Sequence, residues 1–259
     1  MNKLAEILEY KKEEIKLLRR ESLHLSPRPR EKKFLFQKAM ASAQRPFLIA
    51  EVKRKSPSQG DIAMQRDPVD LALAYKEGKA DALSVLTDEH FFGGSFAFLR
   101  EIKEVTGLLI LCKDFIIDEV QIDMAFACGA DMILLIAEAF SDFARLRELY
   151  AYAYSLGMDV LVEVHDRENI LAIQKMNFPI VGVNNRDLRT LEEDYHYSLA
   201  VIHDLPAEAK KLSLSGIATT EAVRELGEAG YDGLLIGTSL AKHPRPQDLL
   251  AEWKKVSVL

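Results

Sequence analysis

The chain carries a carboxylate and an ammonium group at the end of one strongly apolar segment. Residues 47–60 begin with apolar side chains, place Glu51 and Lys53 two positions apart, and continue into a stretch rich in Ser, Pro and Gly. Alternate residues of a strand share a face, so these two side chains are expected to point the same way. Such a pair can move protons in a reaction, or it can be an ordinary ion pair at the edge of a sheet. This segment alone leaves both interpretations open.

Further polar residues end other apolar segments. Lys113 and Asp114 follow one, Glu163 ends another, and Asn184 and Arg186 end a third. Lysines and glutamates that lie together at the same end of a set of strands can serve as general acid and general base at neutral pH. Lys113 is equally suited to act as a Schiff-base nucleophile or to pair with a neighbouring carboxylate, and the spacing does not choose among these roles. The constellation predicts proton-transfer chemistry.

Small residues end the last two apolar segments. Ser215 and Gly216 follow one, and Gly237 and Thr238 follow the other. Backbone N–H groups at such positions can approach an anion closely, although either glycine alone would also serve a tight turn. In barrel enzymes the loops after the seventh and eighth strands often bind phosphate. The two sites together predict a phosphorylated small-molecule substrate.

The histidines and cysteines do not form a metal-binding pattern. His90 and His165 fall in predicted loops, without the spacing to a second histidine that a metal site needs. Cys112 lies in a strand-like segment and Cys128 in a helix-like one, which favours two core thiols over a disulfide or a zinc cluster. We expect no bound metal.

The composition is that of a folded globular protein. The 259 residues are 48% hydrophobic and 29% charged, and the net charge of −6 argues against an electrostatic nucleic-acid surface. The N-terminus lacks the apolar core of a signal peptide, and no apolar run approaches the roughly 20 residues of a membrane-spanning helix. We therefore expect a cytoplasmic protein that binds neither nucleic acid nor membrane.

Strand-like and helix-like segments alternate along the chain. The eight predicted strands span 47–53, 82–87, 108–113, 131–137, 159–164, 179–184, 210–215 and 233–237. Amphipathic helices are predicted between them, at 68–78, 96–106, 118–128, 143–156, 168–176 and 220–229. Several strands are apolar on consecutive positions, as parallel strands buried on both faces are. The alternation predicts a closed (β/α)8 barrel of the TIM type.

An additional helical segment precedes the first strand. Residues 1–45 contain apolar positions at helical spacing, followed by a Ser-Pro-Arg-Pro-Arg break at 26–30. No low-complexity linker divides the rest of the chain. We expect a single barrel domain over 1–259, of which 1–45 is an N-terminal helical extension that packs on the barrel.

Four motifs in the predicted strands and loops resemble the indole-3-glycerol phosphate synthase family. They are Ile-Ala-Glu-Val-Lys-Arg-Lys-Ser-Pro-Ser at 49–58, Ser-Val-Leu-Thr-Asp-Glu-His-Phe-Phe-Gly-Gly-Ser at 84–95, Lys-Asp-Phe-Ile-Ile-Asp-Glu-Val-Gln-Ile at 113–122, and Asn-Asn-Arg-Asp-Leu at 184–188. The resemblance covers nearly the whole chain, keeps the family order of motifs and includes the helical extension. It implies ring closure of 1-(2-carboxyphenylamino)-1-deoxyribulose 5-phosphate with loss of carbon dioxide and water, without a cofactor or metal.

The resemblance also implies roles for the strand-end residues. Lys113 would be the general acid that protonates the substrate ketone oxygen, and Glu163 would assist proton transfer around that oxygen. Glu51 and Lys53 would serve the later dehydration and hold the substrate carboxylate or hydroxyls. The remaining implied contacts are phosphate binding by Ser56, Ser215, Gly216, Gly237 and Thr238, orientation of the substrate by Asn184 and Arg186, and an apolar wall around the anthranilate ring from Phe92, Phe115 and Leu135.

One position departs from the family pattern. Where the family has Glu-Ser-Gly-Ile after the seventh strand, this chain has Leu214 followed by Ser-Gly-Ile. The change removes a negative charge from a lysine-rich mouth and should make protonated lysines there less stable. We expect an active enzyme with slower turnover.

Other functions are weighed against the synthase. Phosphoribosylanthranilate isomerase would need a Cys and Asp pair and a tryptophan synthase α subunit a Glu and Asp pair, whereas this chain presents Glu51, Lys53, Lys113 and Glu163. A non-catalytic or weakly active phosphate-binding barrel is the alternative that Leu214 allows. Family analogy favours a monomer.

Overall fold

The computed structural model describes residues 3–21, 31, 33–43, 46–56, 60–187 and 192–256. Eight parallel strands form a closed barrel in the order β1-β10-β9-β8-β7-β6-β5-β4. They are β1 (Phe47–Val52), β4 (Ala82–Leu86), β5 (Leu109–Lys113), β6 (Met132–Ile136), β7 (Asp159–Val164), β8 (Ile180–Asn184), β9 (Lys210–Leu214) and β10 (Gly233–Ile236). Each predicted strand agrees with an observed one to within one residue at either end, and the predicted TIM barrel is confirmed.

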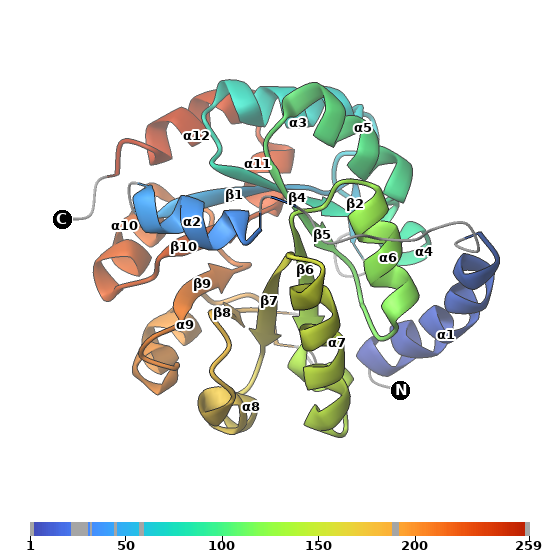
Figure 1. The fold of residues 1–259 in the computed structure, drawn as a ribbon. Helices are drawn as coiled ribbons and strands as arrows, with labels where there is room; N and C mark the ends of the chain where they lie inside the picture. The colour runs from blue at the N-terminus through green and yellow to red at the C-terminus, as the bar shows by residue number, and fades with distance from the viewer. Residues whose placement is uncertain are drawn as a thin grey trace.

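Helices follow the strands and surround the barrel (Figure 1). They are α3 (Pro68–Glu77), α5 (Phe96–Thr106), α6 (Glu119–Ala127), α7 (Phe143–Ser155), α8 (Arg167–Ile173), α9 (His196–Val201), α10 (Thr220–Ala229), α11 (Thr238–Lys242) and α12 (Pro246–Trp253). Most of them, namely α3, α5, α6, α7, α8 and α10, begin at an Asp, Ser or Thr whose side chain accepts from a backbone N–H of the first turn. Asp118, for example, forms a reciprocal capping box with Gln121 at the start of α6.

Two short elements at the barrel mouth were not predicted. A hairpin of β2 (Lys55–Ser56) and β3 (Gly60–Asp61) follows β1, and residues 57–59 between them lie outside the described part. The four-residue helix α4 (Glu89–Phe92) follows β4, with Asp88 as its N-cap. Both carry residues that reach the candidate site.

Strand alternation divides the core into two layers. Inward-facing residues such as Ile49, Leu111, Leu161 and Leu212 fill the barrel. Their sequence neighbours pack outward against the helices and form a larger cluster. Both layers are apolar because helices cover the outside of the sheet, as the consecutive apolar positions in the sequence predicted.

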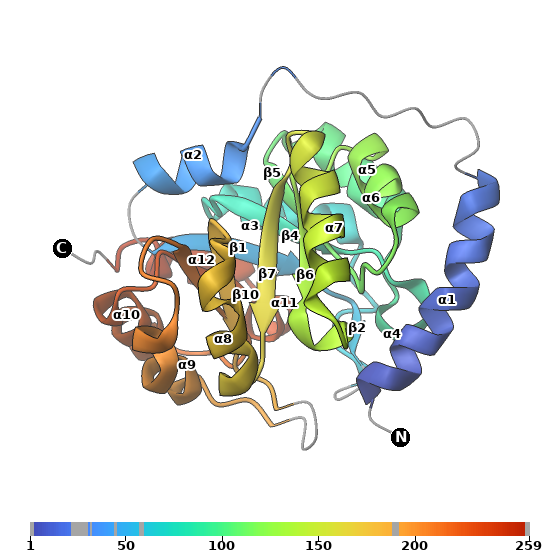
Figure 2. The ribbon, with the colours of Figure 1, turned by 60° about the horizontal axis from the view of Figure 1, so that its bottom comes forward.

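The N-terminal segment forms two helices that contact different ends of the barrel. Helix α2 (Leu35–Ser42) inserts Phe36 and Met40 into the bottom of the inner core, and Asp159 accepts hydrogen bonds from the Phe36 N–H and the Gln37 side chain, both at 2.7 Å. Helix α1 (Lys3–Glu21) lies beside α6, with its N-terminus toward the end where the strands finish (Figure 2). The predicted break at 26–30 lies outside the described residues.

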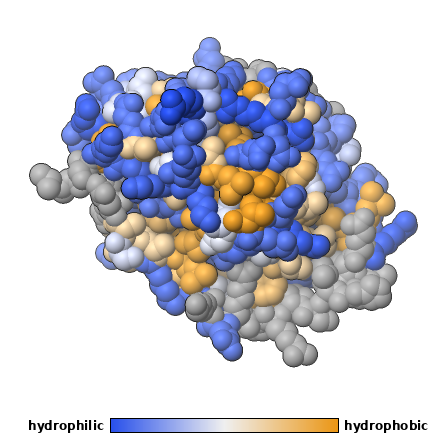
Figure 3. Space-filling view, turned by 90° about the horizontal axis from the view of Figure 1, so that it is seen from above, coloured by the Kyte–Doolittle hydropathy of each residue, from blue (hydrophilic) through white to orange (hydrophobic). Residues whose placement is uncertain are grey.

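The face that carries α3 and α12 is mostly hydrophilic, with a hydrophobic area in its middle (Figure 3). Exposed apolar side chains in this part of the fold include Leu73 on α3 and Val105 on α5. Within the described residues, no helix combines the length and the apolar character that crossing a membrane requires.

Candidate active site

A cavity of about 960 Å³, counting the part open to solvent, occupies the end of the barrel where the strands finish. Alternate residues of each strand face the inside of the barrel, and the last of them line the cavity. Lys53 faces the same way as Glu51, and His165 the same way as Glu163. Most of the predicted site residues meet here. They are Glu51, Lys53, Ser56, Phe92, Lys113, Phe115, Glu163, Asn184, Arg186 and Ser215.

Glu51 and Lys53 form a close pair on one side of the cavity. The Lys53 ammonium lies 2.8 Å from Oε1 of Glu51, and both side chains are largely buried. Burial alone would raise the pKa of Glu51, but the positive charges of Lys53 and Lys113 outweigh it and lower the pKa below its ordinary value. Glu51 is therefore an ionised acceptor at neutral pH.

Gly237 leaves the space that this pair needs. A Cβ atom built on Gly237 would lie 2.5 Å from Oε1 of Glu51 and 3.0 Å from Nζ of Lys53. Because this residue, directly after β10, has no side chain, the two charged groups can lie against its backbone. The glycine predicted for phosphate binding thus also leaves room for the charged pair.

Lys113 and Glu163 form a second pair across the mouth. Nζ of Lys113 donates to Oε2 of Glu163 at 3.1 Å, while Asn184 donates to Oε1 at 3.0 Å. Glu163 is 1% exposed and its pKa is lowered, because Lys113 and His165 together outweigh the effect of burial. The Lys113 side chain keeps 16% of its surface exposed and lines the cavity. An ammonium group paired with an ionised carboxylate therefore faces the cavity.

His165 belongs to the same group of side chains, which the sequence did not predict. Its Nε2 lies 3.4 Å from Oε1 of Glu163 and its Nδ1 3.1 Å from Oε2 of Glu138. Counting two residues beyond Glu163 along the strand would have indicated it. His90, the other histidine that the sequence places in a loop after a strand, stacks on Tyr10 with ring centroids 4.3 Å apart and does not line the cavity.

A second cavity, of about 780 Å³ including its open part, adjoins the first at the ends of β9 and β10. The two share Glu51, Lys53 and Ser215 among their walls. The second is also lined by Gly216, Gly237, Thr238 and Ser239. Ser56, predicted to contact phosphate with these residues, lines the first cavity instead.

The turn after β9 has an unusual backbone. Ser215 and Gly216 both have positive φ, at 67° and 72°, a conformation that favours glycine and is uncommon for serine. Asn185 holds this turn by donating to the Ser215 carbonyl oxygen at 2.9 Å, and its other hydrogen bonds run to Ser198 and Ser213. The buried amide therefore fixes the shape of the wall between the two cavities.

Arg186 stands between the two cavities. It lines the first cavity and pairs with Glu193, which lines the second. The same two residues form an isolated antiparallel bridge that folds the loop after β8 back on itself. Residues 188–191, which include the last residue of the fourth motif, lie outside the described part of the chain.

The predicted wall of apolar residues needs one correction. Phe92 and Phe115 line the first cavity with ring centroids 5.9 Å apart, but Leu135 is fully buried in the outer core between the barrel and the helices. Leu134 and Ile136 line the cavity instead. The assignment of Leu135 was wrong because both faces of β6 are apolar, so the sequence did not reveal which parity faces inward.

Leu214 points into the barrel at the base of the first cavity. It is 1% exposed, and its Cδ1 lies 2.5 Å from where a Cβ atom of Gly182 would stand. Leu214 thus fills the space left by a glycine on the neighbouring strand β8. Position 214 faces the inside of the barrel, so a glutamate there would also point toward the cavity.

The sequence model of the indole-3-glycerol phosphate synthase family matches residues 4–253. The chain belongs to this family. Its relatives include the indole-3-glycerol phosphate synthases of Desulfotalea psychrophila, 40% identical over 97% of this chain and 98% of the relative, and of Priestia megaterium, 41% identical over 92% of each.

Solved structures confirm the type of fold. The chain resembles 3-hexulose-6-phosphate synthase with a TM-score of 0.63 and 16% identity, covering 82% of this chain and 99% of that one. A thiamine phosphate pyrophosphorylase from Pyrococcus furiosus is similar with a TM-score of 0.61 and 14% identity, covering 82% of this chain and 96% of that one. At these identities the similarity concerns the barrel alone.

Proposed function

We propose that the protein is an indole-3-glycerol phosphate synthase that closes the indole ring of 1-(2-carboxyphenylamino)-1-deoxyribulose 5-phosphate. The observation that carries this proposal is the Lys113–Glu163 pair, 3.1 Å apart and facing the cavity at the mouth of the barrel. Membership of the synthase family supports the substrate. The reaction releases carbon dioxide and water, which makes the enzyme a carboxy-lyase.

The first step joins the aromatic carbon that bears the carboxylate to the ketone carbon of the substrate. The ketone oxygen gains negative charge as this bond forms, and Lys113 donates a proton to it, which produces a hydroxyl group. Glu163 stabilises the ammonium group before transfer and receives help from Asn184, which holds its other oxygen at 3.0 Å. This geometry favours the general-acid role of Lys113 over a Schiff base.

The second and third steps restore the aromatic rings. The carboxylate leaves as carbon dioxide, and its bonding electrons return to the benzene ring. The new hydroxyl then leaves as water while the adjacent methylene carbon loses a proton, which completes the indole. Lys53 and Glu51 are close enough to act together in this dehydration, as proton donor to the departing hydroxyl and acceptor of the methylene proton, with ionised Glu51 as the base.

The remaining residues bind the two ends of the substrate. We assign the phosphate to the second cavity, where Ser215, Gly216, Gly237 and Thr238 present small side chains and backbone groups. The anthranilate ring is assigned to the first cavity, against the aromatic and aliphatic wall. Ser56, Asn184 and Arg186 line the first cavity and would orient the sugar chain and the carboxylate.

Family membership supports several further assignments. We propose a single domain with the N-terminal helices as its extension, a monomer in the cytoplasm, and a reaction that needs no cofactor. The small-molecule substrate is the only partner assigned.

The test is to supply the purified protein with the carboxyphenylamino-deoxyribulose phosphate and to follow indole fluorescence and carbon dioxide release together. Equal amounts of indole product and carbon dioxide are expected. Phosphoribosylanthranilate serves as the rival substrate in a parallel reaction, where its isomerisation would reveal the other phosphate-binding barrel. No indole product from the first substrate would contradict the proposed function.

A further inference from the structure

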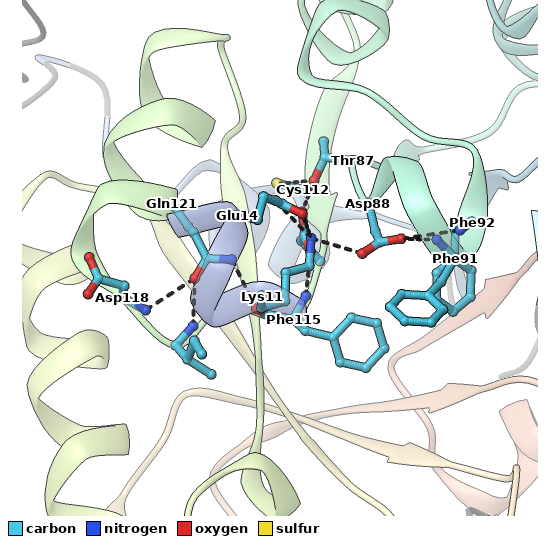
Figure 4. A network of polar contacts seen from close by, with 12 residues as sticks. Lys11, Glu14, Thr87, Asp88, Phe91, Phe92, Cys112, Phe115, Asp118 and Gln121 are labelled. Atoms are coloured by element: carbon cyan, nitrogen blue, oxygen red, sulfur yellow. Dashed lines mark hydrogen bonds and ion pairs between the residues drawn. The ribbon is translucent and has the colours of Figure 1, made fainter. Parts of the chain in front are cut away.

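A buried lysine joins helix α1 to the barrel next to the candidate site. Lys11 has no exposed side-chain surface, and its Nζ lies 2.7 Å from Oδ1 of Asp114, 2.9 Å from Oδ2 of Asp88 and 3.0 Å from both oxygens of Glu14. Figure 4 shows the ammonium group between Glu14 and Asp88, which form a group of three carboxylates together with Asp114. Two of them, Asp88 and Asp114, come from the ends of β4 and β5.

The charges of this cluster favour one position of α1 on the barrel. Burial alone would lower the pKa of Lys11, but the attraction of Asp114 and Asp88 outweighs it and raises the pKa. Lys11 therefore stays charged, and its removal would leave Asp88 and Asp114, both fully or nearly fully buried, without their cation. An unpaired buried carboxylate is strongly unfavourable. The cluster thus selects one position of α1 on the barrel.

The same carboxylates hold the aromatic wall of the first cavity. Oδ1 of Asp88 accepts from the N–H groups of Phe91 at 2.7 Å and Phe92 at 3.2 Å. Oδ1 of Asp114 accepts from the N–H of Phe115 at 2.7 Å, and its Oδ2 accepts from Thr87 at 2.6 Å. The backbone of both wall residues is therefore bonded to a group that Lys11 also contacts.

Helix α1 itself contributes to the cavity. Lys3, Leu4 and Ile7 line it, and Ile7 lies one helical turn before Lys11 on the same face. Docking of α1 therefore changes the cavity in two ways, by adding its own side chains and by fixing the two turns that carry Phe92 and Phe115.

We propose that Lys11 is a positioning residue, which fixes α1, Phe92 and Phe115 in the arrangement that binds the aromatic part of the substrate. Lys11 does not touch the substrate, because its side chain is enclosed by carboxylates. The proposal rests on the proposed function for the identity of that substrate. It predicts that Lys11 affects substrate affinity and leaves the chemical step unchanged.

The test compares Lys11→Met with Lys16→Met. Lys16 lies on the same helix, is 65% exposed and pairs with Glu13, so it controls for the loss of a helical lysine. The probe is the alcohol obtained by reducing the substrate ketone, which cannot cyclise, and its Kd is measured by calorimetry. For Lys11→Met we expect Kd to rise between about tenfold and 10²-fold with turnover at saturating substrate retained, as displaced binding groups would cause. For Lys16→Met we expect the Kd of the parent.

Amide hydrogen exchange gives a second, local measurement. The N–H groups of Phe91, Phe92 and Phe115 should exchange faster in Lys11→Met and at the parent rate in Lys16→Met. Unchanged Kd in a folded Lys11→Met variant would overturn the proposal, and so would unchanged exchange at all three amides. A loss of turnover with unchanged Kd would also overturn it.

A double variant keeps the test decisive if Lys11→Met does not fold. Lys11→Met with Asp114→Asn removes one unpaired charge and keeps an oxygen that can accept from the Phe115 N–H. It should fold and bind the alcohol more weakly than the parent, and parent-like affinity would overturn the proposal. Binding of the alcohol does not require turnover. A parent that binds it without forming indole would contradict the proposed function and leave the Lys11 comparison valid.

Discussion

Lys11 and Lys113 are both paired with carboxylates near the mouth of the barrel, but they differ in how much of their side chains is exposed. Lys11 is enclosed by three carboxylates and has no exposed side-chain surface. Lys113 has one close carboxylate, Glu163 at 3.1 Å, and keeps part of its surface toward a cavity. Both ammonium groups are held by ion pairs, so pairing alone does not mark a reacting lysine. What distinguishes Lys113 is its open side, where a substrate atom can approach.

The two groups also differ in what their carboxylates do. Asp88 and Asp114 use their remaining hydrogen-bonding capacity on backbone N–H groups and on Thr87, so they fix local structure. Glu163 is bonded by side chains from β5 and β8, Lys113 and Asn184, and stands at the cavity wall. We therefore propose that the group around Lys11 fixes the local structure and that the Lys113–Glu163 pair takes part in the reaction.

The largest effect is expected when the Lys113–Glu163 pair loses its carboxylate. Glu163→Gln keeps the shape of the side chain and removes the charge that Lys113 and Asn184 contact. Because proton transfer by a positioned group contributes about 10²-fold to 10⁴-fold, kcat should fall within that range. Steady-state indole formation measures it, with Glu13→Gln on the exposed face of α1 as the matched control. A fall of less than about tenfold, well below that range, would contradict the role of Glu163.

A smaller loss is expected from filling the space beside Glu51 and Lys53. Gly237→Ala would bring a Cβ atom to 2.5 Å from Glu51 and force the charged pair to move. A displacement of this size should lower kcat/KM by about tenfold to 10²-fold. Gly107→Ala is the control, since nothing lies within 4 Å of its added Cβ and its positive φ affects stability alone. If both variants lose activity equally, the special role of Gly237 is wrong.

Leu214→Glu tests the departure from the family pattern. The new carboxylate would stand at the base of the cavity, next to Asn184 in the register of β8 and β9. It would stabilise positive charge in the mouth, so we expect kcat to rise a few-fold, a change of about 1 kcal/mol in the barrier. The measurement is kcat at saturating substrate. Unchanged or reduced turnover would count against the expectation that Leu214 slows this enzyme.

The smallest effect concerns the pH dependence of stability. Because the pKa of Glu163 is lowered in the folded protein, its ionised form stabilises the fold above the ordinary value of 4.5, and this stabilisation is lost as the pH falls through the lower folded value. Lys113→Met removes the largest cause of the lowering and leaves burial, which raises the pKa. Acid unfolding of this variant should therefore begin at a higher pH than in the parent or in Lys16→Met. Circular dichroism during an acid titration measures the difference, and coincident curves would contradict it.

Much of the fold and of the charged site could be predicted from the sequence, because both depend on local patterns. Short apolar segments that alternate with amphipathic ones predicted the eight strands. The position of Glu51, Lys53, Lys113 and Glu163 at the ends of these segments predicted that they meet in one site. Leu135 was misplaced because an apolar run buried on both faces carries no parity signal. The pairing of Ile136 with Glu163 in the register of β6 and β7 supplies that parity, and it requires the structure.

The role of α1 could not be predicted for a different reason. Lys11 occurs in a helix with many charged residues, and its spacing to Glu14 is that of an ordinary surface pair. Its contacts with Asp88 and Asp114 join segments that are distant in the sequence. Only docking of the helix on the strand ends distinguishes this lysine from its exposed neighbours.

The most direct test of the open lysine is a single-turnover experiment with excess enzyme. Parent and Lys113→Met proteins are mixed rapidly with the carboxyphenylamino-deoxyribulose phosphate, and the rate of indole formation is recorded. We predict that the rate in Lys113→Met falls by about 10²-fold to 10⁴-fold, while the reduced alcohol still binds. An unchanged single-turnover rate in Lys113→Met would contradict the account, because the proton would then come from another group.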